Sequence, residues 1–157
     1  MAMFERIQSI LLAGMIFMSL YHISFPIWTA TSVDNNVQVV VTAFSLVASS
    51  GLKILFPYTF SFVFAFIIMM LSVFTLTQYR NIALQRKLIV IIIPACSALL
   101  ICSFLLCSEG QGGCTIPLQQ PVAESGYLVP LTIVVLASLA GYFIQRDYEI
   151  LKDDRLR

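Results

Sequence analysis

Charged side chains are scarce in this sequence. Asp, Glu, Lys and Arg together make up 11% of the 157 residues, whereas hydrophobic residues make up 59%. Soluble domains carry about 25% charged residues, and a chain with so few has too little polar surface to cover an apolar core. The composition therefore predicts an integral membrane protein that forms a single domain. The net charge of +1 gives no indication of nucleic-acid binding, and we expect none.

Four long stretches contain no formally charged residue, and each is long enough to cross a hydrocarbon core of about 30 Å. A cleaved signal peptide ending near Ala30 competes for the first stretch, but that apolar run is longer than the usual apolar region of such a peptide. We expect an up-and-down bundle of four transmembrane helices, all-α apart from a small sheet in the external loops. The expected spans are about 7–27, 58–77, 88–106 and 128–144, with external loops at 28–57 and 107–127, a cytoplasmic loop at 78–87 and a tail at 145–157.

The residues that usually carry membrane chemistry are missing from these spans. Ionisable residues inside a membrane mark ion pathways and substrate sites, and the four spans contain no Asp, Glu, Lys or Arg. His22 is the single histidine, so neither a bis-histidine haem site nor a zinc site is expected. It also lacks an obvious base for a Ser–His pair, and we interpret it as a packed or boundary residue. We predict no catalytic residues, no cofactor and no metal.

The four cysteines divide into two pairs. Cys96 and Cys102 fall in the third predicted span, where we interpret them as small packing residues. Cys107 and Cys114 bracket a glycine-rich stretch, 108–113, that we expect to be irregular on the external, oxidising side. Their spacing permits a disulfide there. A redox-active thiol pair is less favoured, because the CxxC spacing is absent.

The first external loop is predicted to contain strands. Residues 37–47 are rich in β-branched residues and lie between two turn signals, Asp34-Asn35-Asn36 and Ser49-Ser50-Gly51. Residues 52–56 could supply another strand. Together these two segments suggest a small antiparallel meander against the outer ends of the helices. A single interfacial helix over 37–47 is the alternative. Trp28, at the end of the first span, is expected to be an interfacial aromatic.

Cations are concentrated on one side of the predicted topology. Eight of the nine Lys and Arg residues lie in the N-terminal head, the 78–87 segment or the tail, and Lys53 is the exception. The positive-inside rule therefore predicts that this segment and both termini lie in the cytoplasm. Within the basic segment, Arg80, Asn81, Arg86 and Lys87 are candidates for setting topology by contact with anionic headgroups, or for docking a cytoplasmic partner.

The remaining pattern concerns helix packing. Ala137 and Gly141 form a small-xxx-small pair that allows a neighbouring helix to approach closely. With no catalytic constellation in view, we expect a non-enzymatic structural or accessory subunit whose partners are membrane lipids and other membrane subunits. A small carrier or lipid-handling protein, with an apolar groove between phenylalanine-rich helices, is the alternative.

Several stretches also resemble a known family. They are Glu5–Leu12, Phe25–Trp28, the basic segment Tyr79–Leu88 and the tail Lys152–Arg157. Together they are similar to a domain-of-unknown-function family of four-span inner-membrane proteins of Bacteroidota. Ile82 and Ala83 stand where that family has basic residues. The resemblance implies a four-span topology and a location in a bacterial inner membrane, with both termini cytoplasmic, and it implies no activity.

Overall fold

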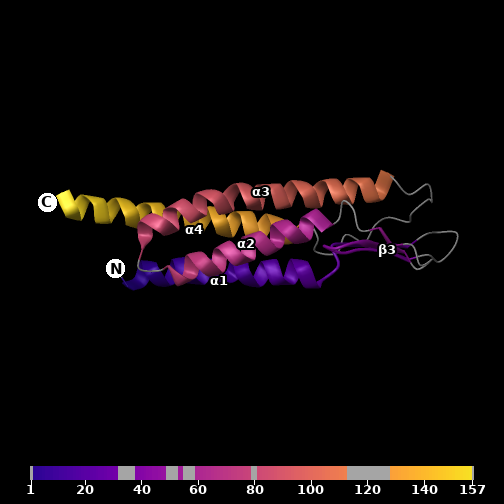
Figure 1. Ribbon diagram of the computed structural model, residues 1–157, viewed down its shortest axis with the longest axis horizontal. Coiled ribbons are helices and arrows are strands. Elements are labelled where there is room, and N and C mark those ends of the chain that lie inside the picture. The colour runs from indigo at the N-terminus through magenta and orange to yellow at the C-terminus, as the bar shows by residue number, and fades with distance from the viewer. Residues whose placement is uncertain are drawn as a thin grey trace.

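Four long helices dominate the structure, a computed structural model that describes residues 2–31, 38–48, 53–54, 59–78, 81–112 and 128–156. The helices run alternately up and down, as predicted. Both chain ends and the α2–α3 connection lie at one end of the bundle, the termini end, and the strands lie at the other, the sheet end (Figure 1). The helices are α1 (Ala2–Ser24), α2 (Thr59–Thr77), α3 (Ile82–Gly112) and α4 (Leu128–Leu156).

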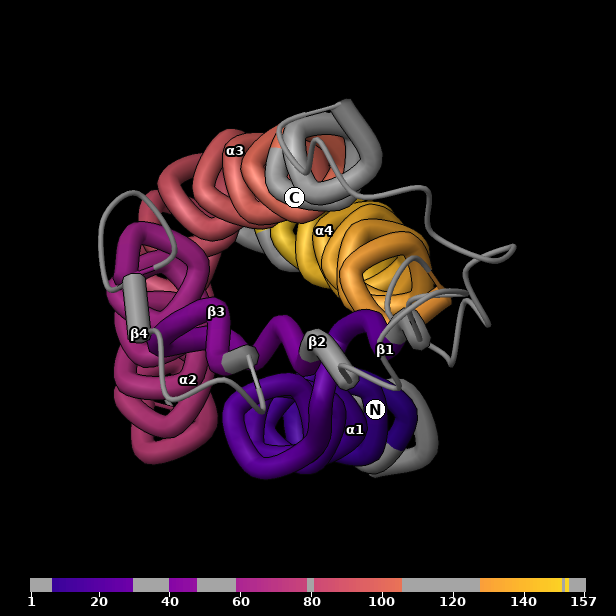
Figure 2. Tube along the Cα trace, turned by 90° about the vertical axis from the view of Figure 1, so that its right-hand side faces the viewer, coloured from indigo at the N-terminus to yellow at the C-terminus, as the bar shows by residue number. Residues whose placement is uncertain are grey.

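The helices form a ring in which each contacts two others. α1 packs against α2 and α4, and α3 packs against the same two helices (Figure 2). Each contains a stretch long and apolar enough to cross a membrane, so the chain is a multi-pass integral membrane protein. These candidate spans are Ile7–Ser24, Thr59–Thr77, Ile82–Leu105 and Leu128–Ile150.

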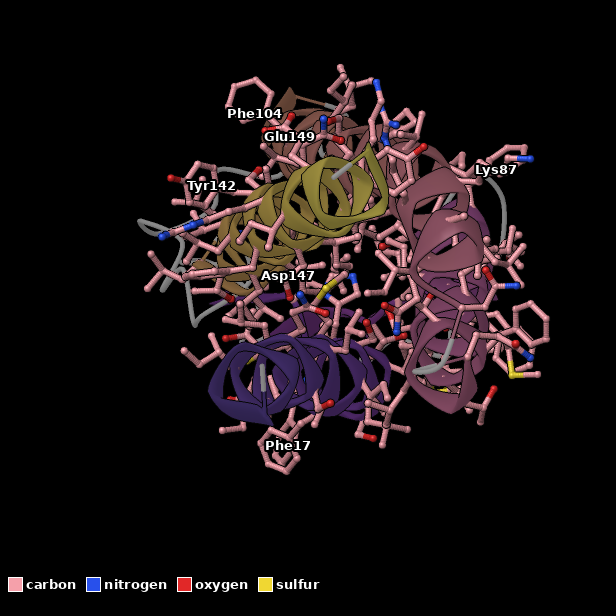
Figure 3. All side chains as sticks on the ribbon, turned by 90° about the vertical axis from the view of Figure 1, so that its left-hand side faces the viewer. Phe17, Lys87, Phe104, Tyr142, Asp147 and Glu149 are labelled. Carbon is pink, nitrogen blue, oxygen red and sulfur yellow. The ribbon has the colours of Figure 1, made fainter. Side chains whose placement is uncertain are left out.

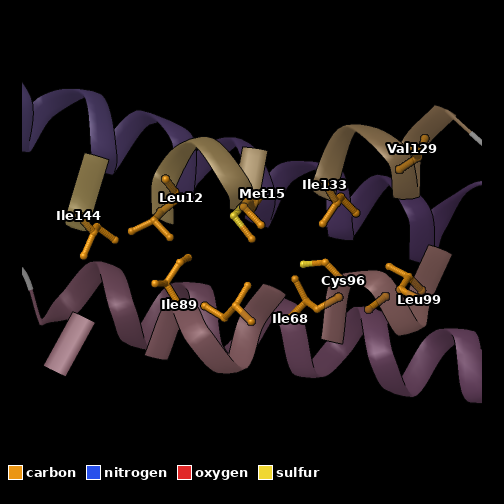
Figure 4. Close-up of a cluster of buried hydrophobic side chains, with 13 residues drawn as sticks. Leu12, Met15, Ile68, Ile89, Cys96, Leu99, Val129, Ile133 and Ile144 are labelled. Carbon is orange, nitrogen blue, oxygen red and sulfur yellow. The ribbon is translucent and has the colours of Figure 1, made fainter. Parts of the chain in front are cut away.

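The residues that face the interior recur at alternating steps of four and three. This heptad-like spacing keeps one stripe of each helix turned toward its neighbours, as in other antiparallel four-helix bundles. Apolar members of the stripes meet in one core along the bundle axis (Figure 4). The stripes are Gln8, Leu12, Met15, Ser19 and His22 in α1; Ser61, Ala65, Ile68, Ser72 and Thr75 in α2; Gln85, Ile89, Ile92, Cys96, Leu99 and Ser103 in α3; and Ile133, Ala137, Ala140 and Ile144 in α4.

The first connection forms the predicted antiparallel meander. Its strands are paired in the order β1-β2-β3-β4, with Trp28 opposite Val41 and Val41 opposite Leu46. The interfacial-helix alternative for 37–47 is wrong over the described residues of that segment. The strands are β1 (Trp28–Thr31), β2 (Gln38–Val41), β3 (Leu46–Ala48) and β4 (Lys53–Ile54). All four belong to the first connection, and residues 113–127 of the second lie outside the described residues.

Two details of this region differ from expectation. The segment 37–47 is two strands rather than one, because a turn interrupts it: Thr42 and Ser45 bond through their main chains, and the Thr42 hydroxyl also donates to the Ser45 carbonyl. Trp28, expected as an interfacial aromatic, is 1% exposed, so its side chain is buried within the protein rather than presented to lipid headgroups.

The sheet is anchored directly on the end of α2. The Phe62 amide donates to the Ala43 carbonyl at 3.2 Å, and the rings of Phe44 and Phe62 stack with their centroids 4.2 Å apart. At its other side the Ile27 amide donates to the Val41 carbonyl at 2.7 Å. The turn between β2 and β3 therefore fixes the sheet to the bundle.

Two helices are longer than the predicted spans. α3 begins at Ile82, so residues 82–87 are helical rather than loop, and it continues through residues 108–112, which we expected to be irregular. Ala, Leu, Gln, Arg and Lys are good helix formers, and a glycine costs a helix only about 1 kcal/mol relative to alanine. Hydropathy therefore located the membrane-crossing part of α3 but not its ends. α4 likewise continues to Leu156, well beyond 144.

Candidate functional site

Polar side chains enter the bundle interior at both ends. At the sheet end, His22 of α1 and Ser61 of α2 share a hydrogen bond of 2.9 Å between Nε2 and Oγ, whose direction follows the imidazole tautomer. Both side chains are buried. The sequence did not indicate a serine partner for His22. Ser61 occupies the same heptad-spaced stripe as the core residues of α2, and that spacing is the signal that could have identified it.

Other polar groups near the core have no hydrogen-bond partner within the described part of the chain. Ser19, Ser72 and Ser103 are fully buried, and so is the indole nitrogen of Trp28, which can only donate. By contrast, the Ser97 and Ser138 hydroxyls donate to the carbonyls four residues earlier in their own helices, at 3.1 and 2.9 Å. The interior thus contains buried hydroxyl and indole groups that form no hydrogen bond with a described residue.

At the termini end, a second polar layer closes the interior. The Gln8 amide of α1 donates to the Asp147 carboxylate of α4, and the Gln85 amide of α3 donates to the Thr75 carbonyl of α2 at 3.1 Å. Viewed from this end, Asp147 lies between α4 and α1 (Figure 3). The four helices are therefore cross-linked in two pairs by glutamine side chains.

Asp147 lies beyond the predicted fourth span, which ended at 144 and contained no acid. The residue is half-buried one turn past Ile144, and its carboxylate accepts a hydrogen bond from Gln8 of α1. A carboxylate at this position is solvated by protein groups such as the Gln8 amide, which is the usual condition for an acid near the membrane interior.

Apolar layers separate the two polar ends. Leu12 and Met15 of α1, Ile68 of α2 and Ile92 of α3 are at most 1% exposed and meet in the middle of the bundle. Close-packed aliphatic side chains leave no polar partners for an ion or a proton along the axis. No group of three or more His, Cys, Asp or Glu able to hold a metal ion occurs among the described residues.

The basic segment is built into the start of α3. Asn81 caps the helix: its side-chain oxygen accepts from the Leu84 amide at 3.2 Å, as an N-cap residue does. The Arg86 guanidinium carbon lies 4.7 Å from the centroid of the Tyr148 ring of α4. Lys87 is exposed on the outside of the ring of helices (Figure 3). Arg80 lies outside the described residues.

The residues predicted for helix packing and the predicted cysteine pairs lie in different parts of the chain. Ala137 is buried in the core, and a methyl group added to Gly141 would lie 3.4 Å from Ile93 of α3, so this small pair faces α3 within the bundle. Cys96 is buried and Cys102 half-buried, both as free thiols. The predicted disulfide lies outside the described residues, because Cys114 is not among them and only the helical backbone of Cys107 is described.

The outer surfaces of α2 and α4 differ in chemistry. The exposed residues of α2 include Phe66, Met70 and Phe74, which are typical of a lipid-facing helix. The outer face of α4 exposes Leu131, Val135, Ser138 and Tyr142, spaced by four, three and four residues. The same spacing recurs on the outer face of α2 at Val63, Ile67, Met70 and Phe74, so what distinguishes the α4 face is the pair of hydroxyls at Ser138 and Tyr142. Hydroxyl side chains are typical of contacts between membrane helices.

Comparison with known proteins adds one family. The model of a protein family described as a domain of unknown function, DUF4293, matches residues 4–156, nearly the whole chain. No curated protein matches the sequence.

Proposed function

We propose that this chain, which belongs to the DUF4293 family, is a non-enzymatic accessory subunit of a bacterial inner-membrane assembly. The bacterium would be a member of the Bacteroidota, and both termini would lie in the cytoplasm. The proposal is carried by the way the polar groups of the interior are used. His22 bonds Ser61 and Gln8 bonds Asp147, so these polar side chains join one helix of the bundle to another.

The same interior argues against transport through the bundle. Aliphatic layers at Leu12, Met15, Ile68 and Ile92 separate the two polar ends. A molecule whose interior is filled in this way acts most simply through its surface. Among its surfaces, the outer face of α4 carries exposed hydroxyls at Ser138 and Tyr142 that suit a partner helix, and this face is the proposed subunit contact.

The proposed contact is tested by photocrosslinking in intact cells. A photoreactive amino acid is placed at Ser138 or Tyr142 on the outer face of α4, and at Met70 or Phe74 on α2 as matched controls. We expect the α4 positions to link to one protein that also co-purifies with the chain in a fixed ratio, and the α2 positions to link to lipid. Lipid adducts from all four positions would contradict the subunit proposal, and bound lipid in an isolated monomer would favour the lipid-handling alternative.

The proposed orientation is tested separately at Lys87. This side chain is exposed, so a Lys87→Cys variant in a background without other cysteines can react with a membrane-impermeant maleimide. We expect labelling in inverted vesicles and none in intact spheroplasts. The reverse pattern would place the termini end outside the cytoplasm and overturn the orientation, while leaving the proposed α4 contact unaffected.

A further inference from the structure

Arg86 is held in a fixed place at the seam between α3 and α4. Its guanidinium carbon lies 4.7 Å from the centroid of the Tyr148 ring, within the range of a cation–π interaction. Arginine stays charged at any pH that the protein experiences. A permanent positive charge is therefore positioned on the bundle surface, half-buried, near the termini end of the candidate span Ile82–Leu105.

This charge is not neutralised by a carboxylate within the part of the chain that the structure describes. The two acids flanking Tyr148 have other partners: Asp147 accepts from Gln8, and Glu149 accepts from Gln145 at 2.8 Å. Lys87, the next residue along α3, is exposed and likewise forms no ion pair with a described residue. Two adjacent cations thus remain available to an external anion.

The cations sit at the end of an apolar track. Lys87, Val90, Ile91 and Pro94 follow one another at helical spacing on the outside of α3, and Val90 and Ile91 are 64% and 56% exposed. This track runs from the polar end of the span toward its middle, as a lipid acyl chain would.

We propose that Arg86 and Lys87 bind the phosphate of an anionic phospholipid at the termini end of α3, with its acyl chains along Val90 and Ile91. Tyr148 acts as a positioning residue that orients the Arg86 guanidinium. A lipid uses both the charge and the apolar track, whereas a free phosphate ion gains nothing from the track. The site is independent of the α4 contact proposed above, because it lies on α3 and involves no partner protein.

The test is native mass spectrometry of the purified full chain with equal amounts of phosphatidylglycerol and phosphatidylcholine. We expect phosphatidylglycerol to be retained preferentially. Each cation near a membrane surface contributes roughly 1 kcal/mol, which is about fivefold in affinity. The double variant Arg86→Gln, Lys87→Gln is therefore expected to lose about 25-fold in phosphatidylglycerol binding. Phosphatidylcholine should lose less, because its own choline ammonium offsets the charge of its phosphate.

Three further variants separate binding from general effects of charge and folding. Arg146→Gln removes one cation from α4 near the same end and is expected to leave the preference intact. Tyr148→Phe keeps the ring face beneath Arg86 and should also retain it, whereas Tyr148→Leu should reduce it. Circular dichroism checks the helical content of each variant. If the double variant does not fold, the single variant Lys87→Gln, which changes an exposed position, is compared with the unmodified chain instead.

The outcomes that overturn the proposal are specific. Equal retention of the two lipids by the unmodified chain would show that no anionic site exists. An equal loss in Arg146→Gln and in the double variant would show general charge attraction rather than a site at α3. Displacement of the lipid by millimolar inorganic phosphate, with no dependence on Val90 or Ile91 when either is changed to Ser, would assign the site to free phosphate.

Discussion

The Gln8 side chain of α1 donates a hydrogen bond to the Asp147 carboxylate of α4 across 139 residues of sequence. This bond joins the first and last helices at the termini end, where Gln8 is 5% exposed. A carboxylate inside a helical bundle is stable only when protein groups replace its hydration. The pair therefore contributes both to closing the ring of helices and to keeping an acid at the edge of the membrane interior.

Replacing Gln8 by Leu should destabilise the bundle by about 1–3 kcal/mol, because the Asp147 carboxylate loses a buried donor. Asp147→Leu alone should be destabilising for the same reason, since it leaves the Gln8 amide buried. The double variant should recover part of the loss. All three variants are compared by their free energy of unfolding, measured in mixed detergent micelles of increasing denaturing strength. Gln145→Leu, on the exposed side of α4, is the control, and strictly additive losses would contradict a direct coupling of the pair.

Ser61→Ala should lower the free energy of unfolding by about 1–3 kcal/mol, because it leaves a ring nitrogen of buried His22 without its partner at 2.9 Å. Ser138→Ala offers a matched control, since that hydroxyl is exposed and bonds within its own helix. We expect the control to change stability by less than about 0.5 kcal/mol. Thermal denaturation in detergent, followed by circular dichroism, distinguishes the two variants. Equal melting temperatures would show that the His22–Ser61 bond contributes nothing.

The two small residues that face α3 should respond differently to enlargement. A methyl group added to Gly141 would meet flexible ends of Ile93 and Ile89 at 3.4 and 3.6 Å. Gly141→Ala should therefore be neutral or stabilise the helix by up to about 1 kcal/mol. Ala137→Leu places a large side chain in a fully buried position and should cost about 1–3 kcal/mol. Unfolding in mixed micelles provides the comparison, and equal effects of the two variants would contradict the packing described here.

Asn81→Ala should destabilise the start of α3 by about 1 kcal/mol, because it removes the side-chain acceptor of the Leu84 amide. Asn81→Asp preserves that acceptor and should retain the stability. Amide hydrogen exchange at residues 82–85 reports the fraying directly, with residues 128–131 at the start of α4 as an internal reference. Unchanged exchange in Asn81→Ala would show that the side-chain cap contributes nothing to the start of α3.

How much of the fold followed from the sequence is clearest in the helices. Hydropathy predicted four spans, because a hydrocarbon core allows a backbone to satisfy its hydrogen bonds only within helices or closed barrels. It did not predict that α3 begins at Ile82 and ends at Gly112, because helical propensity continues where hydropathy does not. In the first connection, β-branched composition predicted a meander, while the Thr42–Ser45 turn that splits it depends on side-chain to main-chain bonds.

The candidate site was much less predictable. Arg86 and Lys87 stood out in the sequence by their charge, and uncharged Asn81 was selected because it lies in the same basic segment. The partner of Arg86 is Tyr148, a residue of another helix with no distinguishing signal in the sequence. Similarly, His22 was noticed as the single histidine, but its bond to Ser61 depends on how α1 and α2 face each other.

The sequence by itself determined that this chain is a membrane protein, how many times it crosses and where its cations lie, because those properties depend on the solvation of each segment taken separately. The tertiary structure decided which polar residues are brought together: Gln8 with Asp147, His22 with Ser61, and Arg86 with Tyr148. Such pairs depend on the rotation of each helix about its axis. That rotation is set by the packing of all four interior stripes at once, and no single segment contains it.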